Sequence, residues 1–551
     1  MITDSEKIAL ITSDDKKISY NELLRSVTVF SEILLQVKPK DKILIWAENS
    51  EYWIYAFLSI WHQNAIPIPL DSNATPEILS YAINTCVPKY VFVSEKNAKT
   101  LKSLVRFLNH KFKIIVIDDY KNVAIHTKLP ANIQFKNEDT ALILFSSGVT
   151  GLPKPVMLSF TNILFCINAA TESLFSDKDC LLAILPFHHI LPLTSTLILP
   201  LHIGATIVFP PHLIMTDMIF ETLQKHNVSV IVGVPNVFAN IYDSMMSKIY
   251  ANKFATFLYK LSQKFNNLSI ARFLFRKIHK ESGNSIRFFL SGGVKLDEKI
   301  YYGFYALGFE ILEGYGMTET APIITFSRLN DTIAGSVGKK LKGTQIKILD
   351  GEIVVRGPNV MQGYYNAPIE TSKVLTNGWF FTGDIGTIDS KGYLRITGRI
   401  SELIIMPNGK AVNPYEVESE LKRYSDFVRD VGVFENDGEL YAVIVIKYHR
   451  YNYLVGNEKI YYEMELKNMT KLDIIEEYNK TVSEYKHIKK FYITIEDLPR
   501  TKSGKLKRHK LHQLFKSTSY DKSTTHIEYE FDVVDSNKNL INRNLITSEY
   551  I

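Results

Sequence analysis

The stretch Ala141-Leu-Ile-Leu-Phe-Ser-Ser-Gly-Val-Thr-Gly-Leu-Pro-Lys-Pro155 joins a short apolar run to a loop rich in hydroxyl groups and glycine. The run 141–145 has the length and composition of a buried strand. The loop that follows carries groups that suit phosphate oxygens: Ser146, Ser147, Gly148, Thr150, Gly151 and Lys154. Backbone N–H groups of such a loop can wrap a polyphosphate. The stretch therefore predicts a strand that leads into a phosphate-binding loop, with an ordinary Ser/Gly turn as the alternative.

The loop does not end in the Gly-Lys-Ser/Thr of a Walker loop, and no other stretch of the chain supplies that ending. It closes on Pro155 instead. Proline lacks an N–H donor and fixes its φ, but Pro155 follows the lysine and lies outside the glycine-bearing part of the loop. We therefore expect the proline to be tolerated.

Short apolar runs alternate with helix-length amphipathic segments on the N-terminal side of this loop. The runs 42–46 and 90–93 predict strands, and the segments 51–63 and 76–85 between them predict helices. Strands that alternate with helices in this way are typical of parallel sheets covered by helices. The sequence therefore predicts an α/β fold of layered, largely parallel sheets.

The chain has 551 residues, which is too long for one hydrophobic core and predicts two or more domains. We expect a large N-terminal domain over 1–398, whose part at about 344–397 is β-rich because short strands alternate there with turn signals. A new alternation of strands and helices predicts a small α+β C-terminal domain over 399–516. The polar segment 517–551 has no helical period, and we expect it to be a loose tail.

The composition excludes several classes of protein. A formal charge of +6 is mild for this length, so no nucleic-acid partner is expected. Cys86, Cys166 and Cys180 form no Cys-x-x-Cys pair, so the sequence suggests neither a zinc site nor a disulfide framework, and a reducing cytoplasm fits best. The first ten residues lack the pattern of a signal peptide. The most apolar region, 181–209, is interrupted by proline and histidine and predicts buried core rather than a spanning helix.

Five further motifs follow the loop in a fixed order. They are Phe288–Gly293, Glu313–Thr320, Phe381–Asp384, Ile396–Arg399 and Pro499–Lys505. Together with the loop, this series resembles the adenylate-forming (AMP-binding) superfamily, which includes acyl-CoA synthetases, firefly luciferase and the adenylation domains of peptide synthetases. The resemblance runs from about residue 10 to 516. Within the superfamily, the stretches 185–193 and 272–289 look like bacterial long-chain fatty acyl-CoA and acyl-carrier-protein synthetases.

The resemblance implies roles at the phosphates. Lys505 matches the family lysine that bridges the carboxylate and the α-phosphate, and Glu319 matches the glutamate that binds Mg²⁺. Carboxylate oxygen is a ligand that suits Mg²⁺ shared with phosphates. Thr318 would contact the α-phosphate, and His189, in Pro186-Phe-His-His189, would stand near the acyl carboxylate. The alternative for His189 is a buried histidine with its hydrogen bonds satisfied.

Further roles concern the nucleoside and the thiol. Tyr315 would lie against the adenine, which the backbone of Ser291, Gly292 and Gly293 would let approach closely, because glycine has no side chain to block it. The ribose hydroxyls would be bound by Asp384, with Arg399 as a further donor. The alternatives are a turn aspartate and a surface arginine. Gly409 would lie on the face of a mobile C-terminal domain that serves thioester formation.

Three positions depart from the family pattern: Val149 in the loop, Pro155 after it, and Ser401 at the expected hinge. Val149 removes one hydroxyl but no backbone donor, and a hinge can be built from various residues. We therefore expect an enzyme that uses ATP, Mg²⁺ and coenzyme A, and that activates a medium- or long-chain fatty acid as acyl-AMP. Acyl carrier protein is the alternative acceptor, and a catalytically silent relative that binds a nucleotide or a lipid is the alternative of another class.

The segment 243–280 is basic and aromatic, with apolar residues such as Phe254, Phe257 and Phe265 at helical spacing. This pattern predicts an amphipathic helical insert. One interpretation is a peripheral contact with the inner face of the membrane, where fatty acids partition. The other is a helix that packs on its own domain.

Overall fold

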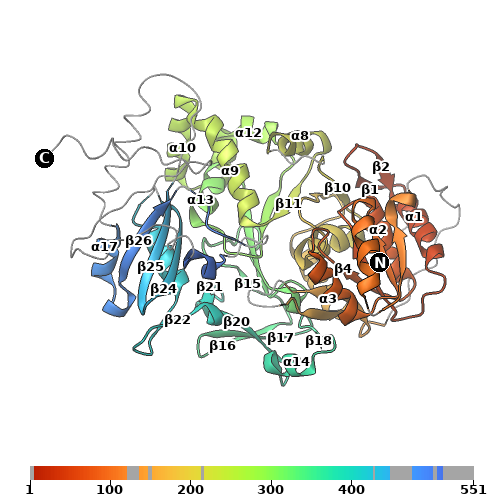
Figure 1. The fold of residues 1–551 in the computed structure, drawn as a ribbon. Helices are drawn as coiled ribbons and strands as arrows, with labels where there is room; N and C mark the ends of the chain where they lie inside the picture. Colours follow the sequence, from red (N-terminus) through yellow and green to blue (C-terminus); the bar gives the residue numbers. More distant parts are fainter. Residues whose placement is uncertain are drawn as a thin grey trace, which may run out of the picture. The chain divides into compact units, whose positions relative to one another are not determined.

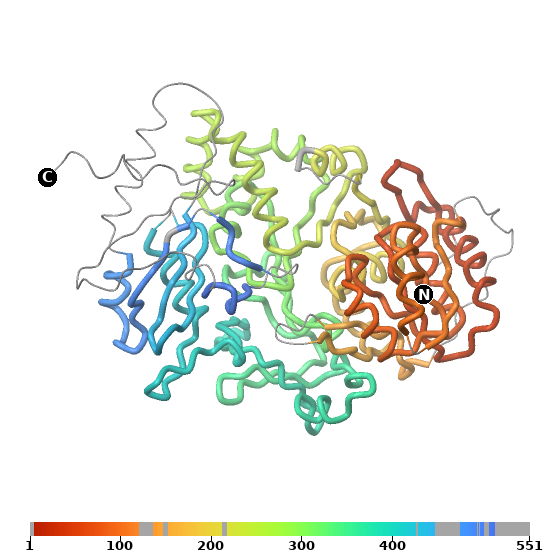
Figure 2. Tube along the Cα trace, viewed as in Figure 1, coloured from red at the N-terminus to blue at the C-terminus, as the bar shows by residue number. Residues whose placement is uncertain are grey.

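The computed structural model describes residues 5–108, 110–120, 136–146, 152–211, 216–425, 428–446, 474–494, 496–500 and 506–512. Figures 1 and 2 follow the chain from end to end. It divides into two compact units. The first comprises Met1–Thr382 with Thr387–Ile396, and the second comprises Gly383–Gly386 with Thr397–Ile551. The domain limits of 1–398 and 399–516 stay a prediction, and the tail 517–551 lies outside the described residues.

The largest sheet of the first unit has nine strands in the order β15-β14-β13-β12-β11-β9-β10-β1-β2. The strands from β13 to β1 are parallel, and the two edges are antiparallel. The strand bounds are β1 Ile8–Ile11, β2 Lys17–Ser19, β9 Cys180–Leu182, β10 Thr206–Val208, β11 Val230–Gly233, β12 Phe288–Ser291, β13 Ile311–Tyr315, β14 Thr325–Phe326 and β15 Lys339–Lys340.

A second, four-stranded parallel sheet has the order β4-β3-β5-β6. Its strands are β3 Lys42–Trp46, β4 Ile66–Pro69, β5 Tyr90–Val93 and β6 Lys113–Val116, with helices α2 Glu51–His62, α3 Pro76–Cys86 and α4 Glu95–Leu104. These elements follow the predicted alternation of strand and helix, and the layered α/β fold is confirmed.

Helix α2 is buried on almost all its faces, from Trp53 to Trp61. A helix that is apolar all round must be covered on every side. Its side chains lie in one core cluster with Ile43 of β3 and Ile207 of β10. The core around α2 therefore joins the two parallel sheets. Ser50 begins the helix by accepting a hydrogen bond from the Trp53 N–H at 3.2 Å.

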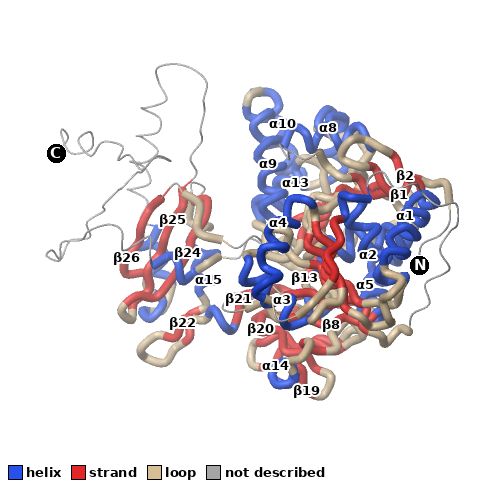
Figure 3. The backbone as a smooth tube through the Cα atoms, turned by 45° about the vertical axis from the view of Figure 1, so that its right-hand side comes forward, coloured by secondary structure: helices blue, strands red, loops and turns tan. Residues whose placement is uncertain are grey.

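The remaining helices of the first unit cover the sheets, and Figure 3 shows α9, α10 and α13 together. Their bounds are α1 Tyr20–Ile33, α5 Phe160–Ser173, α6 Ile190–Pro192, α7 Leu199–Ile203, α8 Thr216–His226, α9 Pro235–Tyr250, α10 Lys253–Phe265, α11 Leu268–Leu274, α12 Arg276–Glu281, α13 Glu298–Ala306 and α14 Pro368–Val374. A π-helical stretch, Leu193–Ile198, joins α6 to α7. In the described part of the chain no helix is long and apolar enough to cross a membrane.

A small antiparallel sheet, β18-β8-β7, holds the predicted phosphate loop. Strands β7 Thr140–Phe145 and β8 Pro155–Ser159 pair with each other, and β18 Gly363–Tyr364 pairs with β8. Phe145 lies opposite Pro155, and the Ser146 N–H donates to the Lys154 carbonyl at 2.9 Å. Pro155 heads its strand, where a missing N–H is tolerated, and its carbonyl accepts from the Tyr365 N–H at 2.7 Å.

The β-rich region forms a sheet with the order β16-β17-β20-β19, and β21 pairs with β20. The strands are β16 Gln345–Leu349, β17 Glu352–Arg356, β19 Leu375–Thr376, β20 Trp379–Ile388 and β21 Leu394–Arg399. Asp350 and Gly351 turn between β16 and β17 with φ of 49° and 86°, as their left-handed preference predicts.

The second unit is a smaller α+β body, as expected. Its sheet, β24-β25-β26, comprises Val428–Asn436, Glu439–Ile446 and Ile488–Thr494, with α15 Pro414–Leu421, α17 Ile474–Thr481 and the hairpin β22 Ile404–Ile405 and β23 Ala411–Val412. Strands β24 and β25 are antiparallel, and β26 runs parallel to β25. Its core contains Val433, Ile444 and Tyr478.

Candidate active site

The carboxyl ends of parallel strands β12 and β13 bring two of the motifs to one edge of the large sheet. Ser291 is the last residue of β12 and pairs in register with Glu313, two residues before the end of β13 at Tyr315. In open α/β sheets ligands bind outside the carboxyl ends of the strands. The segment after Ser291 and the segment after Tyr315 are therefore placed where a nucleotide would bind.

Gly292 and Gly293 follow Ser291, and each position favours glycine for a different physical reason. At Gly292 a Cβ atom would meet Leu191 Cδ2 at 3.1 Å, so a side chain there would force its neighbour to move. Gly293 has a φ of +85°, which favours glycine. The Ser291 Oγ is buried, and among the described residues it has no hydrogen-bond partner. A buried hydroxyl without a partner is rare and fits a group that a ligand would satisfy.

A tight turn holds Thr318 and Glu319 after β13. The Met317 N–H donates to Thr320 Oγ1 at 3.0 Å, and the Thr320 N–H donates back to the Met317 carbonyl at 2.9 Å. Thr320 is buried, whereas Thr318 and Glu319 are half-buried. Tyr315 is 7% exposed and lies in a cluster with Ile324, and its contact with an adenine stays a prediction.

Tyr364 links the loop lysine to the glutamate of the second motif. Its hydroxyl donates to Glu319 Oε1 at 3.0 Å, and the Lys154 Nζ lies 5.0 Å from the centre of its ring. Burial, with a smaller contribution from Glu319, raises the pKa of Tyr364, so the phenol keeps its proton at neutral pH and acts as a donor. The structure thus brings Lys154 to the ring and Glu319 to the hydroxyl of one aromatic side chain.

Backbone contacts fix this cluster. Tyr364 pairs with Val156 in the small sheet, and the Met361 N–H donates to the Glu319 carbonyl at 2.9 Å. The sequence analysis missed Tyr364. Its only local signal is the Gly363-Tyr-Tyr365 triplet, which has neither the length of a predictable strand nor a charged group.

His189 stands in a segment that is anchored by Asn49. The Asn49 side chain donates to the Leu185 carbonyl and accepts from the Phe187 N–H, both at 2.9 Å. Phe187 is fully buried, and the His188 and His189 rings lie with centres 4.2 Å apart. Asn49 is a second residue that the sequence analysis missed. Both histidines are half-buried, and the role of His189 stays a prediction.

Asp384 and Arg399 pair with each other in the second unit. Arg399 Nε lies 2.8 Å from Asp384 Oδ1, and the aspartate side chain is only 4% exposed. The structure thus brings these two sequence-predicted residues together. An ionised carboxylate only accepts hydrogen bonds, which suits hydroxyl donors, and binding of a ribose by this pair stays a prediction.

Gly409 lies in the turn between β22 and β23 with a φ of +78°, and its N–H donates to the Met406 carbonyl at 2.8 Å. Among the described residues, no atom lies within 4 Å of a Cβ built at Gly409. Glycine is therefore required there by backbone conformation rather than by space. Ser401 is exposed in the short 3₁₀ turn Ile400–Glu402. Its role as a hinge stays a prediction.

Several predicted residues lie outside the described part of the chain. They are Ser147, Gly148, Val149, Thr150, Gly151 and Lys505. The residues on either side of 501–505 are described. Arg500 and Leu506 form an isolated antiparallel β-bridge, and the Lys507 N–H donates to the Pro499 carbonyl at 2.7 Å.

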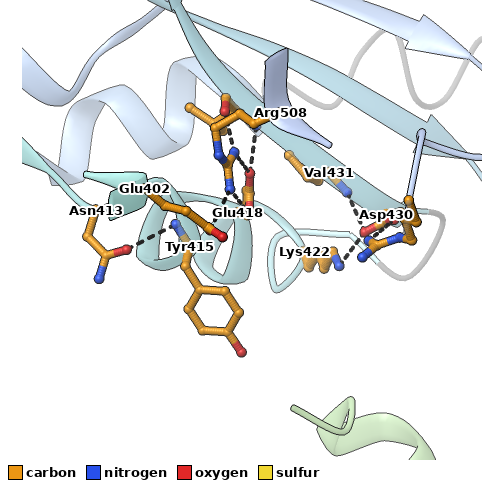
Figure 4. Close-up of polar contacts among 10 residues, drawn as sticks. Glu402, Asn413, Tyr415, Glu418, Lys422, Asp430, Val431 and Arg508 are labelled. Carbon is orange, nitrogen blue, oxygen red and sulfur yellow. Dashed lines mark hydrogen bonds and ion pairs between the residues drawn. The ribbon is translucent and has the colours of Figure 1, made fainter. Parts of the chain in front are cut away.

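Two networks of ion pairs anchor the flanks of 501–505 (Figure 4). On one side Arg500 pairs with Asp430, which also lies 2.6 Å from Lys422 Nζ. Burial alone would raise the pKa of Asp430, but the two cations outweigh it and lower that pKa. Asp430 is therefore a carboxylate at neutral pH.

On the other side Arg508 binds Glu418 through both carboxylate oxygens, one of them at 3.4 Å, and also donates to the Val433 carbonyl. Glu418 accepts in addition from the Val433 N–H at 2.7 Å, and Glu402 lies 3.7 Å from Arg508. Burial raises the pKa of Glu418, and Arg508 opposes that rise. Neither network was predicted from the sequence.

Comparisons with protein families match both units. The family model described as AMP-binding enzyme matches residues 3–365, and the model described as AMP-binding enzyme C-terminal domain matches residues 401–520.

Curated relatives include acid–thiol ligases with different acids. The chain is 26% identical to the long-chain-fatty-acid–CoA ligase FadD15 of Mycobacterium tuberculosis, over 71% of this chain and 70% of the relative. It is 28% identical to a 2-succinylbenzoate–CoA ligase of Geobacillus, over 92% and 95%. It is 27% identical to the chloroplastic long-chain-fatty-acid–[acyl-carrier-protein] ligase AEE15 of Arabidopsis thaliana, over 78% and 72%.

Solved structures agree with the fold. ATP-bound MatB from Rhodopseudomonas palustris superimposes with a TM-score of 0.76 at 24% identity, covering 94% of this chain and 97% of that one. The O-succinylbenzoate coenzyme A synthetase MenE from Bacillus subtilis, in complex with ATP and magnesium, gives a TM-score of 0.70 at 25% identity, covering 92% and 97%.

Proposed function

The chain belongs to the family of AMP-binding enzymes, and from this premise we propose that it activates a medium- or long-chain fatty acid as acyl-AMP and transfers the acyl group to coenzyme A. It is an AMP-forming acid–thiol ligase. The observation that carries the proposal is the cluster in which Tyr364 joins Lys154 to Glu319, because an adenylation site must hold a polyphosphate between a cation and a metal-binding carboxylate.

The first half-reaction joins two anions. A carboxylate oxygen of the acid attacks the α-phosphorus of ATP, the bond from that phosphorus to the bridging oxygen breaks, and pyrophosphate leaves. Fixed cations and donors lower the barrier by stabilising the charge that develops on the phosphoryl oxygens. We assign this work to Lys505, Thr318 and the loop from Ser146 to Lys154, with His189 beside the acid.

The proposal assigns further residues to the nucleoside. Tyr315 and the backbone of Ser291 to Gly293 would face the adenine, where the buried Ser291 hydroxyl would gain a hydrogen-bond partner. Asp384, with Arg399, would accept from the ribose hydroxyls. In the second half-reaction a thiol attacks the acyl carbon and AMP leaves, and we place Gly409 near that thiol.

Mg²⁺ fits Glu319. A carboxylate has about four lone-pair directions, and the Tyr364 hydroxyl donates to Oε1 of this one at 3.0 Å. Mg²⁺ is usually held by one or two carboxylates together with substrate phosphates and water. When bound, it would neutralise charge on the phosphate oxygens.

The proposal also specifies the acid substrate and the thiol acceptor. The similarity to FadD15 and AEE15 supports a fatty acid, and the same two relatives divide between coenzyme A and acyl carrier protein as acceptor. We propose coenzyme A as the acceptor because the similar 2-succinylbenzoate ligase is also named as a coenzyme A ligase. We place the enzyme in the cytoplasm, since its three cysteines are unpaired.

The decisive test is formation of palmitoyl hydroxamate from ATP, Mg²⁺, palmitate and hydroxylamine. Lys505→Ala is expected to lower the rate by roughly 10²–10³-fold, as for the loss of one preorganised donor. Lys510→Ala, an exposed lysine nearby, is the matched control and should leave the rate unchanged. A wild-type protein that binds ATP without exchanging pyrophosphate would support the catalytically silent relative instead. A panel of acids of increasing length, against coenzyme A and acyl carrier protein, then separates the finer alternatives.

A further inference from the structure

Helices α10 and α11 expose an unusual group of large apolar side chains. Phe254, Phe257 and Phe265 of α10 are 67%, 59% and 55% exposed, and Ile270 and Phe273 of α11 are 40% and 70% exposed. We call these five residues the aromatic surface. Helices α10 and α11 contact each other. Single exposed apolar residues are ordinary, but a group of them on neighbouring helices is typical of a binding surface.

The chain around the aromatic surface is strongly cationic. Residues 244–280 contain eight lysines and arginines and no aspartate or glutamate, and all eight cationic side chains are exposed. The eight positive charges of residues 244–280 therefore exceed the net charge of +6 of the whole chain. Arg276 also lies against Phe273, with its guanidinium carbon 5.8 Å from the ring centre.

The geometry of α10 sets the apolar and cationic side chains next to each other. At about 100° per residue, its three exposed phenylalanines fall within roughly 80° of one another. Lys253, Lys260 and Lys264 fall within roughly the next 60°. An apolar stripe with a cationic border is the pattern of a helix that lies in a membrane interface.

The opposite face of α10 holds the helix on its own unit. Ser262 Oγ donates to the Ala306 carbonyl at 2.8 Å, and the Tyr259 and Tyr242 hydroxyls lie 2.9 Å apart. Packing on the domain, one of the two interpretations of this segment, is therefore confirmed for Tyr259 and Ser262. It does not account for Phe254, Phe257 and Phe265, which lie on the other side.

We propose that the aromatic surface and its lysines dock this protein on an anionic lipid membrane, with the phenylalanines inserted at the boundary between headgroups and acyl chains. A second copy of the chain is disfavoured as occupant, because a symmetric contact would set this cationic segment against itself. A purely polyanionic partner would leave the phenylalanines in water. The inference goes beyond the proposed ligase activity and does not depend on it.

Vesicle flotation tests the proposal without ATP or fatty acid. The full chain should float with vesicles that contain phosphatidylglycerol, float weakly with phosphatidylcholine alone, and dissociate as salt is raised. Each basic side chain near an anionic surface contributes roughly a fivefold gain in partitioning, so Lys260→Ala with Lys264→Ala should lower it roughly thirtyfold. Phe254→Ser with Phe257→Ser and Phe273→Ser should abolish flotation.

The matched control is Phe107→Ser with Ile369→Ser, which removes two side chains that are 69% and 67% exposed elsewhere on the same unit. It should float like the wild type, and all variants should keep the wild-type melting temperature and hydroxamate formation from a soluble medium-chain acid. A wild type that ignores anionic vesicles, a control that loses flotation equally, or binding to a single-stranded oligonucleotide but not to vesicles would overturn the proposal. Loss of ligase activity in every sample would bear on the proposed function alone.

Discussion

Polar side chains at the strand ends of the first unit and those around Arg500 and Arg508 of the second unit have different kinds of partner. Around the strand ends of the first unit, Glu319 accepts from a neutral phenol, and the Ser291 hydroxyl has no partner among the described residues. In the second unit, Glu418 and Asp430 are each paired with arginine. A buried hydroxyl without a partner is suited to a ligand, whereas a buried carboxylate that loses its arginine destabilises the fold. We therefore expect substitution of Glu319 to act mainly on catalysis, and substitution of Arg508 or Glu418 to act mainly on stability.

The largest effect should come from breaking the buried pair of the second unit. Arg508→Ala leaves Glu418 buried without its cation, which should lower the free energy of unfolding of that unit by about 3–5 kcal/mol. Urea denaturation followed by a probe in the second unit measures this change. Arg429→Ala, which removes an exposed pair with Asp497, should cost at most about 1 kcal/mol.

A second variant sharpens that result. Arg508→Met with Glu418→Leu removes both charges at once and should recover most of the lost stability, because no buried charge is left unpaired. If the single and double variants were equally unstable, the loss would come from packing and not from charge.

Glu319→Gln should show the reverse pattern. The amide keeps the shape of the side chain but removes the charge that would hold Mg²⁺, so pyrophosphate exchange should fall by roughly 10²–10³-fold while the unfolding free energy changes by less than about 1 kcal/mol. Raising the Mg²⁺ concentration should recover part of the rate. Unchanged exchange would remove Glu319 from the site.

The buried carboxyl of Glu313 should make the stability of the first unit depend on pH. Burial raises the pKa of this carboxyl from 4.5 to about 7, although the Leu296 N–H opposes the shift with a hydrogen bond at 3.2 Å. The folded state therefore binds the proton more tightly than the unfolded state. This contribution to stability is complete below about pH 4.5, and it is lost as the pH rises through about 7.

At about 1.4 kcal/mol per pKa unit, the loss is about 3 kcal/mol. Urea unfolding at a series of pH values should show it in the wild type and not in Glu313→Gln, so that the variant becomes the more stable protein above neutral pH. Parallel curves for the two proteins would contradict the assignment to Glu313.

The smallest effect should come from Tyr364→Phe. This change removes the hydrogen bond to Glu319 but keeps the ring beside Lys154. One hydrogen bond to a charged group contributes about 1.5–3 kcal/mol, so exchange should slow by roughly 10–100-fold, mainly through a higher requirement for Mg²⁺. Tyr365→Phe is the matched control. A loss as large as that of Glu319→Gln would give Tyr364 a direct part in the chemistry.

The sequence predicted those features that depend on short spacing. The strands at 42–46 and 90–93 are short apolar runs, and the helices at 51–63 and 76–85 are amphipathic segments. Each motif residue lies within a short sequence motif. Tyr364, Asn49 and the pair of Arg508 with Glu418 could not be predicted in this way. Arg508 and Glu418 are 90 residues apart, and neither carries a local signal that it will be buried. Such contacts are fixed by tertiary packing, which a one-dimensional pattern does not contain.

The division of the chain bears on how the molecule can be dissected. Because Gly383–Gly386 belongs to the second unit and Thr387–Ile396 to the first, the backbone passes between the units three times. A recombinant fragment that began at Thr397 would carry Arg399 without Asp384, whose carboxylate lies 2.8 Å from it in the intact protein. A recombinant form of the second unit that keeps this pair would have to include residues 383–386 as well as the chain from Thr397 onward.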